Sequence, residues 1–227
     1  MKWFPKIKLP KFFLQVFSNR RNETYWVTRA IFLRFLGFIY LCVFLPLAYQ
    51  YEGLLGSRGL LPIETFLDQY RSYHGSLEVA IKSLPTVFWL NQSDFFALFL
   101  IWTGICLSVL VMLGVVNGAI LLILWLLQLS FTHVGQTFWS FGWESNLIEV
   151  GFLSLFLCPF WRLNLFDPRY PPSRLLMVLY RWVLFRLMLG AGLIKIRGAS
   201  CWEDLTCLQY HFETQPIPNP LSPFFHY

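Results

Sequence analysis

The sequence predicts an all-α membrane protein, a polytopic bundle of about five transmembrane helices. Of its 227 residues, 56% are hydrophobic and only 13% are charged, whereas an ordinary soluble domain carries roughly 25% charged residues. A single soluble core of this size cannot bury so much apolar surface. Apolar runs long enough to cross about 30 Å of hydrocarbon recur along the chain. These observations exclude an ordinary soluble enzyme and a disordered segment.

Five apolar segments are the predicted spans. We place them at residues 30–50, 95–115, 118–131, 138–160 and 175–196. A long polar loop follows the first span and begins with glycine and proline turn signals. Apolar and charged residues then mix at helical spacing, which predicts one or two short amphipathic helices on the lumenal membrane surface. The fourth segment is the weakest, because residues 147–160 alone are too short to cross.

The chain divides into three predicted regions, and its positive residues predict its orientation in the membrane. Residues 1–29 form a basic arm, residues 30–196 the transmembrane helical domain, and residues 197–227 an aromatic, proline-rich tail. With five spans, the arm and the loop before the last span share a side and carry ten Lys and Arg residues together. The positive-inside rule therefore predicts a cytosolic N-terminus and a lumenal C-terminus. The net charge is +6, but the 18 Lys and Arg residues are scattered along the chain, which argues against nucleic-acid binding.

Four ionisable residues inside the predicted spans are candidate functional residues. They are Arg34 in the first span, Glu149 in the fourth, and Arg181 and Arg186 in the fifth. An unpaired charge at this depth is costly. One interpretation is a buried polar site for a ligand or a proton path, and the other is intramembrane ion pairing that fixes helix packing. We expect Glu149 to pair with Arg181 or Arg186.

Two cysteines follow the last predicted span on the predicted lumenal side. The five residues between Cys201 and Cys207 allow the chain to fold back and close a disulfide in an oxidising compartment. The alternative is a pair of free or differently paired thiols. A zinc site that adds His211 has no supporting spacing. Because no motif for catalysis, for a cofactor or for a metal ion occurs, we predict a protein without catalytic activity, cofactor or metal.

Aromatic residues gather in the tail. Its candidate contact residues are Trp202, Tyr210, His211 and Phe212, followed by four prolines. One interpretation is an aromatic belt at the membrane interface. The other is a docking surface for a partner protein, since exposed aromatic side chains on a proline-stiffened segment suit protein recognition. The residues alone leave both interpretations open.

Five sequence runs resemble the N-terminal membrane portion of the lipase maturation factor family. The runs are YWVTRAIFLRFLGFIYL, GLLGSRGLLP, FWSFGWESNLIEVGFLSLFLCPFW, RWVLFRLMLGAGLIKIRG and CWEDLTCLQYHFETQPIPNPLS. The resemblance implies a multi-pass endoplasmic reticulum membrane protein. It also implies a chaperone-like role in the folding, assembly and secretion of dimeric lipases such as lipoprotein lipase, with secreted lipases and membrane lipids as partners.

Two further points follow from resemblance. Family members are expected to continue past the ETQPIPNP run into a large lumenal region, so the printed sequence is expected to be a fragment or a short form. The run Ala191–Lys195 is similar to the catalytic-lysine context of the membrane part of vitamin K-dependent γ-carboxylase. This similarity implies an alternative, a carboxylase-like enzyme that uses Lys195 as a base. A third possibility is a structural subunit of a larger maturation complex.

Overall fold

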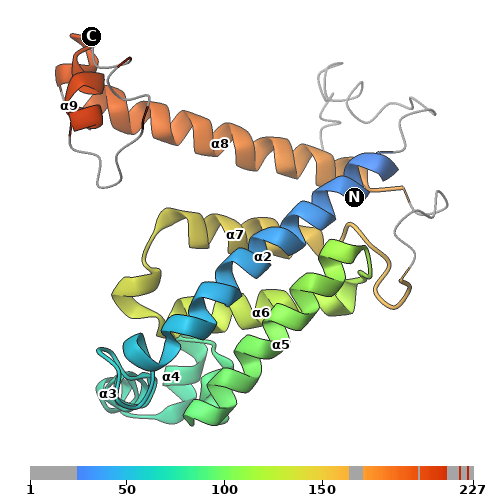
Figure 1. The fold of residues 1–227 in the computed structure, drawn as a ribbon, viewed down its shortest axis with the longest axis vertical. Coiled ribbons are helices and arrows are strands. Elements are labelled where there is room, and N and C mark those ends of the chain that lie inside the picture. Colours follow the sequence, from blue (N-terminus) through green and yellow to red (C-terminus); the bar gives the residue numbers. More distant parts are fainter. Residues whose placement is uncertain (1–24, 164–170, 199, 214–219, 221–223, 225–227) are drawn as a thin grey trace, which may run out of the picture. The chain divides into compact units, whose positions relative to one another are not determined.

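The computed structural model describes residues 25–163, 171–198, 200–213, 220 and 224, and all regular structure in these residues is helical. Figure 1 labels the helices. The chain divides into two compact units, Met1–Met177 and Val178–Tyr227. The described helices are α2 (Trp26–Leu54), α3 (Ile63–His74), α4 (Leu77–Ser83), η1 (Val87–Trp89), α5 (Asp94–Leu113), α6 (Gly118–Val134), η2 (Gln136–Trp139), α7 (Gly142–Ser154), α8 (Arg174–Gly198), η3 (Ser200–Trp202) and α9 (Cys207–Glu213).

Three of the described helices are long and apolar enough to cross a membrane. By length and composition these are Val27–Leu54, Asp94–Leu113 and Arg174–Gly198. The helix Gly118–Val134 is also apolar but shorter, at 17 residues. The all-helical fold class with membrane-spanning helices is therefore confirmed, whereas the count of five crossings stays a prediction.

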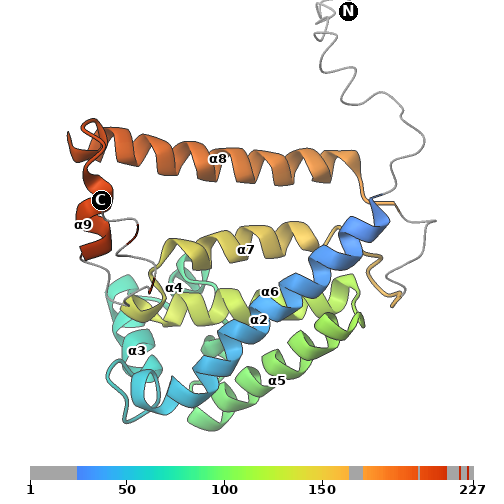
Figure 2. The same ribbon diagram turned by 45° about the horizontal axis from the view of Figure 1, so that its top comes forward.

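Helices α2 and α5 form the closest pair in the first unit and lie side by side (Figure 1, Figure 2). Gly37 permits the approach, because a Cβ added there would lie 2.7 Å from the backbone nitrogen of Met112 and 3.0 Å from the carbonyl oxygen of Ser108. At a second close approach the glycine lies on the other helix: the ring of Phe44 on α2 packs against Gly104 of α5. Small residues let apolar helices approach closely in this way. The paired residues also show that the two helices are antiparallel.

Helices α6 and α7 form a second antiparallel pair. The indole Nε1 of Trp125 on α6 donates a hydrogen bond of 2.9 Å to the carbonyl oxygen of Ile148 on α7. At the start of α6, the backbone nitrogen of Gly118 donates to the carbonyl oxygen of Pro159, and that of Ala119 to Phe160. The segment after α7 therefore caps the beginning of α6.

The four long helices of the first unit alternate in direction, which gives their bundle two ends. The end that holds the α5–α6 connection, the N-terminal turn of α2 and residues 155–160 is called the hairpin end. The opposite end holds residues 51–63, α3, α4, the start of α5 and residues 133–142, and is called the loop end. The alternation follows because α2 packs antiparallel to α5, a short connection joins α5 to α6, and α6 packs antiparallel to α7.

Two element boundaries differ from the sequence-based prediction. Helix α2 begins at Trp26, so Arg29, which we counted with the basic arm, lies inside the helix. The predicted span 138–160 is interrupted, because η2 and α7 are separate helices and α7 has only 13 residues. The backbone leaves the helical conformation between η2 and α7, where Phe141 is extended with φ of −86° and ψ of 149°, and the chain turns there. One straight helix cannot pass through such a turn.

Candidate functional site

Asp94 organises the loop end. Its Oδ1 accepts hydrogen bonds from the Tyr51 hydroxyl at 2.9 Å and from the Ser57 backbone nitrogen at 3.0 Å, and its Oδ2 accepts one from the Ser57 hydroxyl at 2.6 Å. These bonds hold the loop after α2, which also folds back on that helix through backbone bonds from Leu60 to Gly53 and from Leu61 to Leu54. The run GLLGSRGLLP, quoted for the family resemblance, is thus a loop that one carboxylate fixes.

The C-terminal part of α6 ties the rest of the loop end together. The hydroxyl of Ser130 accepts a hydrogen bond of 3.1 Å from the Val87 backbone nitrogen, and Nδ1 of His133 lies 2.8 Å from the carbonyl oxygen of Pro85. Gln136 Nε2 donates to the carbonyl oxygen of Leu61 at 3.2 Å. The residues between α2 and α5 therefore form an ordered platform with the end of α6.

This platform exposes large apolar side chains. Tyr73 is 87% exposed and Leu90 is 84% exposed, whereas Ile63 and Leu67 on the inner face of α3 are buried. Helix α3 thus buries one face and exposes the other, whereas its predicted place on the lumenal membrane surface stays a prediction. On its outer part, the rings of Tyr70 and His74 stack with their centroids 4.4 Å apart. The loop end therefore presents a preformed apolar and aromatic surface.

Arginines hold the hairpin end. Arg29 is 2% exposed, and its Nη1 donates a hydrogen bond of 3.4 Å to the carbonyl oxygen of Leu157, in the turn after α7. Arg34 lies five residues further along α2, and its guanidinium is against Gly114 at the C-terminus of α5, where an added Cβ would lie 3.1 Å from Nη2. A cation suits both places, because the last carbonyl groups of a helix carry partial negative charge.

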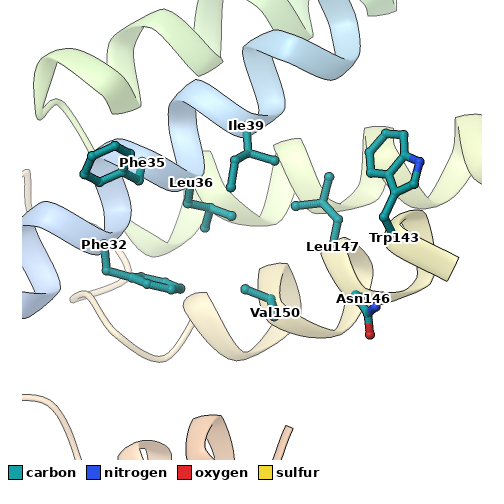
Figure 3. A pocket seen from close by; sticks show the side chains of 8 residues that line it. All are labelled: Phe32, Phe35, Leu36, Ile39, Trp143, Asn146, Leu147 and Val150. Carbon is teal, nitrogen blue, oxygen red and sulfur yellow. The ribbon is translucent and has the colours of Figure 1, made fainter. Parts of the chain in front are cut away.

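An apolar groove of about 380 Å³ lies between α2 and α7 (Figure 3). Figure 3 shows Leu36 and Ile39 of α2 facing Leu147 of α7, with Trp143 at one end and the amide of Asn146 at the margin. The full lining is Phe32, Phe35, Leu36, Ile39, Trp143, Asn146, Leu147 and Val150. An apolar lining with one amide suits hydrocarbon or an apolar side chain and offers no group for acid–base chemistry.

The second unit carries a small cap at the end of α8. Cys201 and Cys207 are joined as a disulfide, with their Cα atoms 4.8 Å apart, and Cys207 is buried. The Nζ of Lys195, on the last turns of α8, lies 4.7 Å from the centroid of the Trp202 ring, a cation–π contact. The structure thus brings together four of the residues that the sequence singled out.

The remaining candidate residues belong to several elements. Glu149 lies half-buried on α7 in the first unit, whereas Arg181 and Arg186 are exposed on α8 in the second, so the expected ion pair stays a prediction. Tyr210 and His211 are exposed on α9. The side chain of Phe212 lies outside the described part of the chain. Within the described residues, no group of three His, Cys, Asp or Glu side chains gathers as a metal site.

Two polar residues buried in the bundle, Glu144 and Gln128, are absent from the candidate residues taken from the sequence. Glu144 is 1% exposed and Gln128 is 0% exposed. One carboxylate oxygen of Glu144 and the amide oxygen of Gln128 have no hydrogen-bond partner among the described residues. Asp94 was likewise overlooked. The sequence does carry a weak signal for Asp94, because Ser-Asp before a long apolar run is typical of a helix N-terminus.

Comparison with known proteins gives the family. The sequence model of the lipase maturation factor transmembrane domain matches residues 27–227. The chain is 44% identical over 216 residues to Lipase maturation factor 1 of Bos taurus and 44% identical over 218 residues to that of Homo sapiens. It is 33% identical over 212 residues to Lipase maturation factor 2 of Xenopus tropicalis. The chain belongs to the lipase maturation factor family, which confirms the resemblance seen in the sequence.

The matches cover most of this chain but a smaller part of each relative. They include 92% of this chain and 38% of either Lipase maturation factor 1, and 88% of this chain and 29% of the Xenopus tropicalis protein. The chain thus spans well under half the length of these curated relatives. No solved structure matches.

Proposed function

We propose that this chain is the membrane domain of an endoplasmic reticulum factor that assists the folding, assembly and secretion of dimeric lipases. The observation that carries the proposal is the 44% identity to Lipase maturation factor 1 along 92% of the chain. The described residues add two features in support, an ordered apolar platform at the loop end and a disulfide-closed cap after α8. Both suit a factor that works by holding a partly folded client and catalyses no reaction.

The proposed topology has five crossings, with a cytosolic N-terminus and a lumenal C-terminus. The alternating directions of α2, α5, α6 and α7 support counting α7, with its flanking turns, as a crossing. Arg29 and Arg34 belong to the hairpin end, and the positive-inside rule favours the cytosol for that end. The loop end and the cap then face the lumen, the compartment in which secreted lipases fold and in which a disulfide persists.

Client binding is proposed at the lumenal aromatic residues. A partly folded lipase exposes apolar surface, and rigid aromatic side chains bury much area with little loss of side-chain entropy. Tyr73 and Leu90 on the platform and Tyr210 on α9 are exposed for such contacts. Trp202 is held by Lys195 and by the neighbouring disulfide, so its ring is oriented before a client arrives.

The contact of Lys195 with Trp202 also bears on the carboxylase-like alternative. A cation–π contact needs the protonated ammonium group, whereas a general base needs the neutral amine. The position over the indole ring therefore favours a structural role for Lys195. Replacing Lys195 with Arg keeps the cation but removes the amine that could act as a base, and replacing it with Ala removes both.

Rescue of lipase secretion tests the proposal. The full chain is expressed with a secreted dimeric lipase in cells that lack their own lipase maturation factor, and active lipase in the medium and chain abundance are measured. We expect the wild-type chain and Lys195→Arg to raise secretion, and Lys195→Ala to lower both chain abundance and secretion. If Lys195→Arg accumulates normally but is as inactive as Lys195→Ala, the enzyme alternative is correct. An abundant wild-type chain that gives no rescue favours the structural-subunit alternative.

A further inference from the structure

A second groove lies on the outer side of α2, beside α5. It has a volume of about 440 Å³ and is lined by Ile31, Arg34, Phe35, Phe38 and Met112. Four of these side chains are apolar, and the fifth carries a permanent positive charge. Ile31, Phe35 and Phe38 are each at least half exposed. The groove is therefore continuous with the apolar surface that α2 presents to lipid.

The depth of Arg34 follows from its neighbour. Its guanidinium lies against Gly114, and Gly114 is the residue at which α5 ends, with φ of 96° and its backbone nitrogen bonded to the carbonyl oxygens of Leu110 and Val111. The connection between two membrane helices lies at the membrane surface, since backbone outside a helix is not tolerated in lipid. The guanidinium therefore reaches the level of the lipid headgroups, while the rest of the groove runs alongside the hydrocarbon.

The length of α2 gives the same depth for Arg34 in the membrane. Its 29 residues extend about 43 Å at 1.5 Å per residue, whereas the hydrocarbon is about 30 Å thick. About four residues at each end therefore lie outside the hydrocarbon. Arg34 comes eight residues after Trp26, only about one turn inside the boundary, which is within the reach of a long side chain that extends toward the interface.

We propose that this groove binds an anionic phospholipid, whose phosphate contacts the Arg34 guanidinium and whose acyl chain lies against Phe35, Phe38 and Met112. Charge complementarity selects this occupant, because the described residues of the lining include one cation and no acid. A guanidinium has five N–H donors and binds phosphate oxygens in pairs, so it contacts the end of α5 and a lipid phosphate together. The site is separate from the proposed client surface at the loop end.

Native mass spectrometry of the purified full chain in neutral detergent tests the proposal. The probes are dioleoyl phosphatidic acid, dioleoyl phosphatidylcholine and inorganic phosphate. We expect the chain to retain phosphatidic acid at least tenfold more strongly than phosphatidylcholine, and inorganic phosphate to compete only at concentrations far above those of the lipid. Equal retention of the two lipids would overturn the proposal. Competition by inorganic phosphate at the same concentration as the lipid would also overturn it, because the apolar groove would then contribute nothing to binding.

Two variants assign binding to this groove. Arg34→Gln removes the charge and is expected to lower phosphatidic acid retention at least tenfold. Met112→Trp fills the groove, keeps Arg34 and is expected to give a similar loss. Arg71→Gln, at an exposed arginine of α3, is the matched control and is expected to bind as the wild type. If Arg34→Gln does not fold, Met112→Trp alone decides, and wild-type retention by a folded Met112→Trp protein would overturn the proposal.

Discussion

The two ends of α5 are held by opposite charges. At its N-terminus, in the loop end, the Asp94 carboxylate binds the Tyr51 hydroxyl and the backbone and side chain of Ser57. At its C-terminus, in the hairpin end, the Arg34 guanidinium lies against Gly114. Both placements complement the helix dipole, which is positive at the N-terminus and negative at the C-terminus. Different residues of α2 and of the loop after it therefore hold the two ends of α5.

The ends differ in how far their charges are withdrawn from solvent. Ser57 is exposed and Asp94 only partly buried, whereas Arg29 at the hairpin end is 2% exposed. The hairpin end also relies on backbone bonds between helix ends, from Gly118 to Pro159 and from Ala119 to Phe160. A buried polar group that loses its partner costs more free energy than an exposed one. We therefore expect the hairpin end to tolerate substitution less well than the loop end.

The packing of α2 against α5 at Gly37, between the two ends of the bundle, is expected to have the largest effect on stability. Gly37→Leu places a side chain against the backbone of α5, which cannot move aside, so the free energy of unfolding should fall by about 3 kcal/mol or more. Unfolding in mixed detergent micelles, followed by circular dichroism, measures it. Gly53→Ala is the control, because an added Cβ at Gly53 meets nothing within 4 Å. A wild-type unfolding curve for Gly37→Leu would mean that α2 and α5 pack differently.

At the hairpin end, Arg29→Met keeps much of the side-chain volume and removes the hydrogen bond to Leu157. We expect a loss of about 1.5–3 kcal/mol in the free energy of unfolding, the usual range for hydrogen bonds to charged groups. The same micelle unfolding assay measures the change. The exposed Arg58→Met should stay within about 0.5 kcal/mol of the wild type. Equal effects of the two substitutions would show that Arg29 is solvated.

At the loop end, Asp94→Ala removes three hydrogen bonds that are less buried. We expect a loss of about 1–2 kcal/mol, smaller than at Arg29, because water replaces part of the lost bonding. Hydrogen exchange of the Ser57 backbone amide gives a local measurement, and exchange should become faster in the variant. Asp68→Ala, at an exposed position of α3, serves as control. A larger loss for Asp94→Ala than for Arg29→Met would reverse the expected order of the two ends.

Tyr51→Phe is expected to have the smallest effect. The side chain is 1% exposed, and the substitution removes only the hydroxyl that donates to Asp94, so the loss should be about 1 kcal/mol. Tyr49→Phe, at a neighbouring position that is 83% exposed, should change stability by less than about 0.5 kcal/mol. Thermal unfolding in detergent compares the pair. Identical midpoints for both variants would mean that the Tyr51 hydroxyl contributes nothing to the loop end.

The amino-acid sequence by itself determined the class of fold and the approximate positions of the long helices. Hydrocarbon thickness sets the length of an apolar span, so runs such as residues 30–50 and 95–115 are visible without any knowledge of their neighbours. Glycine and proline turn signals likewise place the loop after the first span. The break at Ser140 and Phe141, between η2 and α7, was harder to see, because the surrounding residues are apolar enough to continue a helix.

Only the tertiary structure decided which polar residues are buried and what they hold. Arg29 bonds a carbonyl group 128 residues away, and Asp94 bonds a serine 37 residues away. Local pattern assigned Arg29 to the basic N-terminal arm. Helical periodicity shows that a residue lies on a given face. Which face meets another helix depends on close approaches such as that at Gly37, and these depend on contacts between distant parts of the chain.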